Sequence, residues 1–263
     1  MRSLIAMLTD FGYRDGFVGA MKGVILGINP EVTIVDISHE VEPFNVFHGA
    51  MLLRAHFSYF PEGTLFLCVV DPGVGSERLP LVVKAGGYTF VGPYNGLFDL
   101  ALESLREKPR AYRIEKFTLP VVSQTFHGRD VFAPVAAQLS RGLRPEEVGA
   151  PIEYEFTLRL EEPCMEEGWM VGKVIYFDRY GNCVTNLPCG NYKEGKFRGQ
   201  KLYVVSHFLQ GERDKPALIC GSFGMMELFL PMEGAREKLG ISLGEEVRVR
   251  VSLSMDICSM PRV

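Results

Sequence analysis

An apolar strand stops at an acidic, glycine-rich turn in the stretch Leu65-Phe66-Leu67-Cys68-Val69-Val70-Asp71-Pro72-Gly73-Val74-Gly75-Ser76-Glu77-Arg78. A short apolar run bounded by turn residues predicts a buried strand, so Asp71 is expected at its carboxyl end. Open α/β sheets bind their ligands at this edge. Pro72 fixes one backbone angle and Gly73 and Gly75 permit positive ones, so the loop can fold back tightly against a ligand. A plain turn with Asp71 as a capping carboxylate is the alternative.

Strands alternate with helices on the amino-terminal side of this stretch. Such spacing predicts βαβ units with right-handed crossovers and a mainly parallel sheet. On the other side, two short strands around Gly86-Gly87 predict a β-hairpin. The predicted elements are strands over 4–8, 32–37, 65–70, 81–85 and 88–91 and helices over 17–28, 45–57 and 96–106.

The composition changes between residues 141 and 167, where prolines and acidic residues without helical periodicity predict a connector. Beyond it, short strands broken by turn residues are typical of a small sandwich or barrel. We therefore expect an α/β domain over 1–160 and a smaller all-β domain over 161–263 that closes the site. Its predicted elements are strands over 171–177, 201–206, 217–220, 227–230 and 246–253 and a short helix over 235–239.

Composition and charge exclude several classes of partner. With 263 residues, 47% hydrophobic and 23% charged, the sequence is typical of a soluble globular protein. The net charge is -4 and no basic stripe occurs, so no nucleic-acid partner is expected. No uncharged run approaches the roughly 18 residues of a membrane span, and the first apolar run ends before the length of a signal peptide, so no membrane partner is expected.

The six cysteines are scattered without C-x-x-C pairing. This pattern argues against a zinc site and favours a reducing, cytoplasmic location. Cys183 and Cys189 would be able to bridge in an oxidising compartment, and the sequence leaves that pairing open.

Asp10 and Asp15 follow the first predicted strand, at the sheet edge that Asp71 shares. Carboxylates at such an edge suit ribose hydroxyls or an ammonium group. An Asx turn with a helix cap at Asp15 is the alternative. There is neither a G-x-G-x-x-G segment after the first strand nor a Walker A loop, so nucleotides bound through their phosphates are disfavoured.

Polar side chains also gather on two later turns. His127 is one of only five histidines, although an isolated histidine is usually structural. Asp130 is expected to be the N-cap of the helix that follows, with Pro134 in its first turn. In the second turn, Asn182 offers both a donor and an acceptor, and a simple hairpin turn accounts for it nearly as well.

Six short motifs run through the chain: Thr9-Asp10-Phe11-Gly12, Asp71-Pro72-Gly73-Val74-Gly75 with Arg78, Gly92-Pro93-Tyr94-Asn95-Gly96-Leu97, Phe126-His127-Gly128-Arg129-Asp130, Asp178-Arg179-Tyr180-Gly181-Asn182 and Gly221-Ser222-Phe223-Gly224. Their order and spacing resemble those of the adenosine-forming S-adenosyl-L-methionine (SAM) hydrolases, also called SAM hydroxide adenosyltransferases, which are related to fluorinase and chlorinase. The resemblance covers nearly the whole chain. It implies an α/β amino-terminal domain, a smaller β-rich domain and a homotrimer with sites between subunits.

The resemblance also implies roles for single residues. Asp71, Arg78 and His127 match the triad that distinguishes the hydrolases from the halogenases. Asp10 matches the position that holds the ribose hydroxyls, and Asp15 matches a loop carboxylate near the methionine portion.

Further matches concern the walls of the site and the second domain. Phe44 falls at an aromatic wall position occupied by tryptophan in the fluorinase, and Phe126 would be another apolar wall. Asp178, Asn182 and Ser222 match positions that engage the substrate from the second domain. No cofactor and no metal is implied, because SAM is itself the substrate.

The sequence departs from the related halogenases in two places. Gly128 stands where the fluorinase has a serine near the halide, and the long extra loop of the fluorinase is missing between Pro80 and Leu105. Within the hydrolase pattern, Tyr94 replaces an aspartate that many members carry.

The function so implied is hydrolysis of SAM to adenosine and L-methionine by attack of water or hydroxide on the ribose C5′. In this hypothesis Arg78 lowers the free energy of negative charge on the water, His127 accepts or relays its proton, and Asp71 orients the pair. The expected partners are SAM, adenosine and L-methionine. A SAM-dependent halogenase and a non-catalytic SAM or adenosine sensor are the alternatives.

Overall fold

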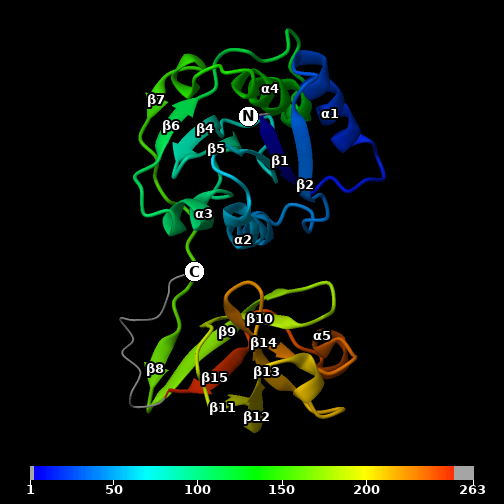
Figure 1. Ribbon diagram of the computed structural model, residues 1–263, viewed down its shortest axis with the longest axis vertical. Helices are drawn as coiled ribbons and strands as arrows, with labels where there is room; N and C mark the ends of the chain where they lie inside the picture. Colours follow the sequence, from blue (N-terminus) through cyan, green and yellow to red (C-terminus); the bar gives the residue numbers. More distant parts are fainter. Residues whose placement is uncertain (1–2, 252–263) are drawn as a thin grey trace. The chain divides into compact units, whose positions relative to one another are not determined.

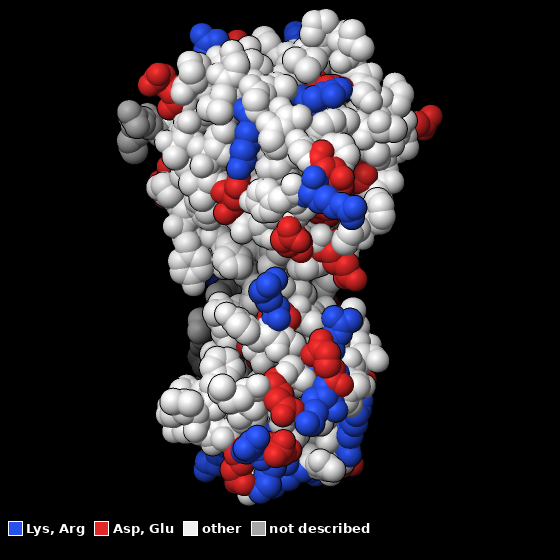
Figure 2. Space-filling model, turned by 90° about the vertical axis from the view of Figure 1, so that its right-hand side faces the viewer, with Lys and Arg blue, Asp and Glu red and all other residues white. Residues whose placement is uncertain are grey.

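The computed structural model describes residues 3–251, and the chain divides into two compact units, Met1–Arg159 and Leu160–Val263. None of the helices within the described residues has the length and apolar character that crossing a membrane requires. On the face drawn in Figure 2, basic and acidic side chains lie beside one another on each unit. In the second unit Arg248 forms ion pairs with Glu166 and Glu246.

A seven-stranded mixed sheet forms the centre of the first unit (Figure 1). The four strands on one side run parallel, as expected, and the three on the other side are joined in antiparallel fashion. The predicted hairpin supplies β4 and β5 and so begins the antiparallel half. The strands, in spatial order, are β2 (Thr33–Ser38), β1 (Leu4–Thr9), β3 (Leu65–Val69), β5 (Tyr88–Pro93), β4 (Pro80–Ala85), β6 (Arg110–Arg113) and β7 (Pro151–Ile152).

Helices cover both faces of this sheet. The helices α1 (Phe17–Ile28) and α4 (Ala133–Ser140) pack together on one face, and α2 (Val46–His56) and α3 (Asp99–Ser104) pack together on the other (Figure 1). Strands covered on both faces read as continuous apolar runs rather than alternating ones, which explains the uninterrupted run before Asp71.

Successive residues of one strand enter different cores, because side chains alternate across a sheet. Ile5 and Met7 of β1 pack in the core beneath α1 and α4, whereas Ala6 and Leu8 pack in the core beneath α2 and α3. Each strand thus joins the two layers of helices, and its carboxyl end is held rigidly at the sheet edge.

The helix after His127 begins differently from the prediction. Gly128–Phe132 forms a π-helical turn ahead of α4, so Asp130 lies within the helical segment and is not its N-cap. The buried Asp130 carboxylate instead accepts the Ser123 amide at 2.8 Å and pairs with Arg129. Pro134 does lie in the first turn of α4, where its missing N–H is tolerated.

Seven strands of the second unit close into a barrel, because β10 pairs with both β14 and β9. All neighbours are antiparallel except β12 and β13. Of the two predicted architectures, the barrel is therefore the one observed. In order around it lie β10 (Cys183–Pro188), β14 (Met225–Phe229), β13 (Ala217–Cys220), β12 (Gln200–Val205), β11 (Glu194–Phe197), β15 (Glu246–Arg250) and β9 (Trp169–Phe177), with β8 (Cys164–Glu166) paired to the outside of β9.

The remaining helices are short. The helix predicted over 235–239 is α5 (Ala235–Leu239), and residues 252–253 of the last predicted strand lie outside the described residues. Three single 3-10 turns complete the secondary structure of the part of the chain that the structure describes: η1 (Phe57–Tyr59), η3 (Pro145–Glu147) and η4 (Phe208–Gln210).

A disulfide joins Cys189 to Cys220, with Cα atoms 5.1 Å apart. Cys183 is free and buried, so the pairing considered from the sequence is wrong. The reason is geometric: β10 begins at Cys183 and ends at Pro188, just before Cys189, so the length of the strand holds the two sulfurs apart.

The predicted connector contains short ordered elements and is fastened to the first unit. The buried carboxylate of Asp99 accepts the Tyr154 hydroxyl at 2.5 Å and the Leu158 amide at 2.8 Å. The Tyr94 hydroxyl accepts the Glu155 amide at 2.8 Å. Tyr94, which departs from the family pattern, therefore anchors the connector.

Candidate active site

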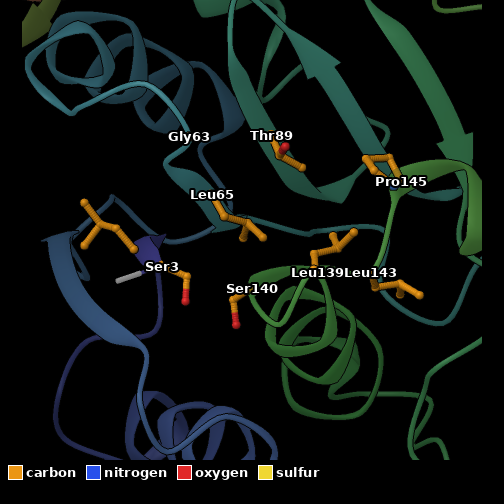
Figure 3. A pocket seen from close by; sticks show the side chains of 10 residues that line it. Ser3, Gly63, Leu65, Thr89, Leu139, Ser140, Leu143 and Pro145 are labelled. Carbon is orange, nitrogen blue, oxygen red and sulfur yellow. The ribbon is translucent and has the colours of Figure 1, made fainter. Parts of the chain in front are cut away.

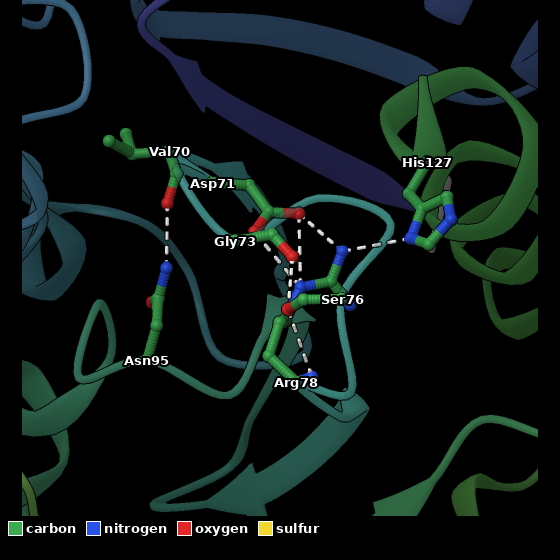
Figure 4. A network of polar contacts seen from close by, with 7 residues as sticks. All are labelled: Val70, Asp71, Gly73, Ser76, Arg78, Asn95 and His127. Carbon is green, nitrogen blue, oxygen red and sulfur yellow. Dashed lines mark hydrogen bonds and ion pairs between the residues drawn. The ribbon is translucent and has the colours of Figure 1, made fainter. Parts of the chain in front are cut away.

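The Asp71 loop begins where β3 ends at the carboxyl edge of the sheet. The Asn95 amide, in the turn after β5, donates to the Val70 carbonyl at 2.8 Å and fixes the strand end from which Asp71 projects (Figure 4). Sequence reasoning gave Asn95 no role. Its position in an Asn-Gly turn directly after a strand was the signal that could have identified it.

The loop is folded back by its small residues. Gly75 has a φ of +77°, and a Cβ there would lie 2.4 Å from the Gln124 carbonyl oxygen. Gly73 does not have a positive φ, contrary to the expectation from the sequence. It is instead crowded by Arg78, whose Cγ would lie 3.3 Å from an added Cβ. Ser76 closes the turn by donating to the Gly73 carbonyl at 2.6 Å.

Arg78, Asp71 and His127 meet in one network, although His127 comes from a different loop (Figure 4). The Arg78 Nε lies 2.9 Å and 3.1 Å from the two Asp71 carboxylate oxygens, and Nη2 donates to Oδ2 as well. Nη2 also donates to His127 Nδ1 at 2.9 Å. The Arg78 and Asp71 side chains are only 10% and 4% exposed, so the ion pair is largely removed from water.

One nitrogen of Arg78 has no partner. Nη1 is buried and makes no hydrogen bond within residues 3–251, while Nε and Nη2 are both engaged. The Arg78 guanidinium carbon lies over the Phe132 ring, 5.2 Å from the ring centroid, in a cation–π contact. Buried donors normally find acceptors, so this unpartnered one marks the place where a bound molecule would supply an acceptor.

The Arg78 contact fixes the protonation of His127. A guanidinium can only donate, so Nδ1 must accept and the ring is neutral with its proton on Nε2. Burial lowers the pKa of His127, and the charge of Arg78 lowers it further. The neutral ring is therefore the stable form in this network.

Asp10 lies near this network, at the end of β1. Its Oδ2 accepts the Phe44 amide at 2.8 Å. Burial raises the pKa of Asp10, and the neighbouring charge of Asp71 also raises it. Phe44 has a φ of 67° and is 73% exposed, so its ring is presented to solvent beside the carboxylate. Asp15 is exposed and is not a helix cap, since Gly16 occupies that position.

Phe126 belongs to an aromatic cluster next to His127. Its ring makes edge contacts with Phe11 and Phe17 at 5.8 Å and 5.2 Å between centroids. A Cβ on Gly128 would lie 3.2 Å from the Phe11 ring and 3.3 Å from the Phe126 ring. The cluster thus leaves little room for a side chain at residue 128.

The site residues predicted in the second unit lie on two of its turns. The Asp178 carboxylate accepts the Asn182 amide nitrogens of backbone and side chain, each at 2.8 Å, and so closes the turn between β9 and β10. Ser222 is exposed on the turn between β13 and β14.

Glu227 is a buried carboxyl of the second unit that sequence reasoning missed. It is 4% exposed, and its Oε1 would lie 1.8 Å from a Cβ on Gly221. Burial, together with the charge of Asp178, raises the pKa of Glu227 to about 7. Nothing in the sequence beyond an acid within an apolar strand signalled this residue.

A hollow of about 190 Å³ lies at the opposite, amino-terminal edge of the first sheet (Figure 3). Leu65, Leu139 and Leu143 line it together with the hydroxyls of Ser140 and Thr89, and no titratable side chain faces it. It therefore offers none of the chemistry gathered around Arg78. Within residues 3–251 no three His, Cys, Asp or Glu side chains are grouped to hold a metal ion.

Comparison with known proteins gives consistent matches over both units. Residues 5–149 match the family model of the SAM hydroxide adenosyltransferase N-terminal domain, and residues 172–248 match that of its C-terminal domain. The (R)-S-adenosyl-L-methionine hydrolase of Thermus thermophilus is 38% identical over 258 residues, which cover 93% of this chain and 98% of the relative. A fluorinase of Actinopolyspora mzabensis is 28% identical over 78% of each chain. The crystal structure of an uncharacterized conserved protein from Thermotoga maritima has a TM-score of 0.85 and 34% identity, covering 94% of this chain and 99% of the other.

Proposed function

The chain belongs to the SAM hydroxide adenosyltransferase family, and from this premise we propose that it hydrolyses SAM to adenosine and L-methionine at a site built on Arg78. The observation that carries the assignment of the site is the buried, unpartnered Nη1 of Arg78, held beside Asp71 and His127. SAM is the substrate in this reaction, and no cofactor takes part in the proposal.

The reaction is a displacement at the ribose C5′. A water oxygen forms the new C–O bond while the C–S bond breaks, and the bonding electron pair passes to sulfur, which leaves as the neutral thioether of methionine. The attacking water loses one proton to give the 5′-hydroxyl of adenosine. Because the sulfonium is already a good leaving group, the enzyme mainly has to orient the water in line with the C–S bond.

We assign that orientation to Arg78. Its Nε and Nη2 are occupied by Asp71 and His127, so the two N–H groups of Nη1 are the donors left for the water. A fixed positive donor in a site with little water stabilises negative charge that develops on the oxygen. Asp71 and His127 then hold the guanidinium in place from two sides.

The role of His127 is narrower than the sequence suggested. Its Nδ1 is occupied by Arg78 and its Nε2 carries the proton, so the ring cannot take up another proton while this contact lasts. We propose that His127 positions Arg78 and that the proton of the water passes to solvent. The proton-relay role remains the alternative.

The residues proposed to bind the substrate come from both units of the chain. The Asp10 carboxylate can accept further hydrogen bonds besides the one from the Phe44 amide, and we propose that it accepts those of the ribose hydroxyls. Asp15 is proposed near the methionine portion, Phe44 and Phe126 as apolar walls, and Asp178, Asn182 and Ser222 as contacts from the second unit.

Three finer properties are proposed. The family resemblance supports a homotrimer, which light scattering of the purified protein tests. The scattered cysteines support a cytoplasmic location, whereas the Cys189–Cys220 disulfide argues against a strongly reducing compartment. We also propose specificity for the R configuration at sulfur, since the Thermus thermophilus relative is named for that epimer. Separate incubation with each epimer tests this point.

Crowding around Gly128 favours hydrolysis over halogenation. The fluorinase-like serine at this place would require Phe11 and Phe126 to move, since an added Cβ already approaches both rings within 3.3 Å. Liquid chromatography of the protein with SAM, with and without chloride, separates the alternatives. Adenosine and methionine indicate hydrolysis, 5′-chloro-5′-deoxyadenosine indicates a halogenase, and bound but unchanged SAM indicates a sensor.

Single substitutions test the site. Arg78→Ala is expected to bind SAM but to lose turnover, and His127→Ala is expected to bind SAM with lowered turnover. Arg144→Ala is the matched control, because within residues 3–251 this exposed arginine forms ion pairs only with Glu146 and Glu147. Wild-type turnover in Arg78→Ala would exclude the proposed site.

A further inference from the structure

A buried histidine that the triad does not use lies beneath the loop that carries Asp10. His39 follows β2 directly and is 1% exposed. Its Nδ1 lies 2.8 Å from the Thr9 hydroxyl at the end of β1. Its Nε2 lies 3.1 Å from Asp36 Oδ1, without hydrogen-bond alignment.

His39 also holds the loop through its backbone. The Gly12 amide donates to the His39 carbonyl at 2.7 Å. The Thr9 hydroxyl oxygen in turn accepts the Phe11 amide at 3.2 Å. The chain is therefore fastened to His39 on both sides of Asp10, once through Thr9 and once at Gly12.

Charged groups around His39 set the direction of these bonds. Although burial raises the pKa of Asp36, the hydrogen bonds from Lys22 and Tyr13 and the nearby His39 ring together lower it, so the carboxylate is ionised. Burial lowers the pKa of His39, which is therefore neutral despite Asp36. The carboxylate favours the proton on Nε2, so Nδ1 accepts from the Thr9 hydroxyl and the Thr9 oxygen is left to accept from Phe11.

Asp36, His39 and Thr9 have the residue types of a nucleophilic triad, but Thr9 cannot act as a nucleophile. Thr9 is fully buried, and its hydroxyl is already engaged on both sides, since it donates to His39 Nδ1 and accepts the Phe11 amide. What the arrangement does is hold the backbone of residues 9–12 in one conformation. Asp10 is the only side chain of that segment with a carboxylate, and it accepts the Phe44 amide.

We propose that His39 is a positioning residue for SAM binding, which acts through Thr9 to hold Asp10 in place for the ribose hydroxyls. This rests on the proposed function. Contacts to the ribose hydroxyls are remote from the breaking bond and hold the ground state and the transition state alike. Their loss therefore raises KM and leaves kcat nearly unchanged.

Three single variants test this role. Thr9→Val and His39→Phe remove the polar link at similar volume, whereas Thr9→Ser retains the hydroxyl. We expect Thr9→Val and His39→Phe each to raise KM about tenfold with kcat within about threefold, the scale of one buried hydrogen bond. Thr9→Ser should keep the wild-type KM. The double variant should show no further increase, since both changes break one link.

Loss of general stability is controlled by Leu65→Ala, which opens the core at the opposite end of the sheet. This variant should lower the melting temperature and leave KM unchanged. An unchanged KM in Thr9→Val, or the same rise in Leu65→Ala, overturns the role of His39. If wild-type protein does not consume SAM, the proposed function fails, and titration of the same variants with adenosine then decides the role of His39 by its Kd.

Discussion

Replacing His127 by asparagine distinguishes a residue that positions Arg78 from one that takes up the proton. The asparagine side-chain oxygen branches from Cγ as Nδ1 does, so it can accept the hydrogen bond from Arg78 Nη2. It is not basic and cannot act as a proton acceptor at neutral pH. Alanine at the same position does neither.

The structure sets the size of the expected effects. The Nη2 to Nδ1 bond is 2.9 Å long and involves a guanidinium whose side chain is 10% exposed. Hydrogen bonds to charged groups contribute about 1.5–3 kcal/mol, so His127→Ala should lower kcat roughly 10- to 150-fold. His127→Asn should retain activity within about tenfold of wild type. Loss of a general base would instead lower kcat about 10²- to 10⁴-fold in both variants.

Single-turnover reactions with enzyme in excess over SAM, followed by chromatography of adenosine, measure the chemical step directly. Equilibrium binding of SAM to each variant confirms that the site is filled. His56→Asn, an exposed histidine on α2, is the matched control and should behave as wild type. A loss beyond about 10²-fold that is equal in His127→Asn and His127→Ala would refute the positioning role.

Three further predictions follow from the geometry. Burial and the charge of Arg78 lower the pKa of His127 below 6.5, so the neutral ring persists to a lower pH. The value of kcat/KM should therefore be full above pH 6.5 and decline as the pH falls through this lowered pKa. A pH profile without this acidic decline contradicts the prediction. Gly75→Ala should cost about 1–2 kcal/mol from the positive φ alone, and more from the contact with Gln124, which a lower melting temperature and slower turnover would report. Cys220→Ser opens a loop with a sequence separation of 31 and should lower the free energy of unfolding by about 3–4 kcal/mol in denaturant titrations, while equal stability with and without reductant would argue against the disulfide.

Local periodicity was enough to predict the elements that are long or fully buried. The helix expected over 17–28 is observed with the same bounds, because its apolar residues recur on one face and Asn29-Pro30 ends it. Strands such as β10 and β11 were missed, since each is defined by neighbours far along the chain rather than by its own pattern. Barrel closure likewise brings Cys189 to Cys220, which no local signal indicates.

In the candidate site too, the residues close together in sequence were predictable, and the contacts between distant segments were not. Asp71 and Arg78 lie on one loop, so a strand end followed by glycines was sufficient to place them near each other. His127 is 49 positions beyond Arg78, and only the family resemblance connected the two before the structure. Asp130 was misjudged because a capping preference was read from a residue type, whereas the π-helical turn starts the helix earlier.

The direction of the hydrogen bonds lies beyond any sequence pattern, and it is what selects the chemistry. A guanidinium has five N–H groups and accepts nothing. Three of them point to Asp71 and His127, which forces His127 Nδ1 to accept a hydrogen bond. The two N–H groups of Nη1 remain without an acceptor. The same side chain thus removes the basic lone pair of the histidine and supplies the free donors, so orientation of water by Arg78 is favoured over proton abstraction by His127.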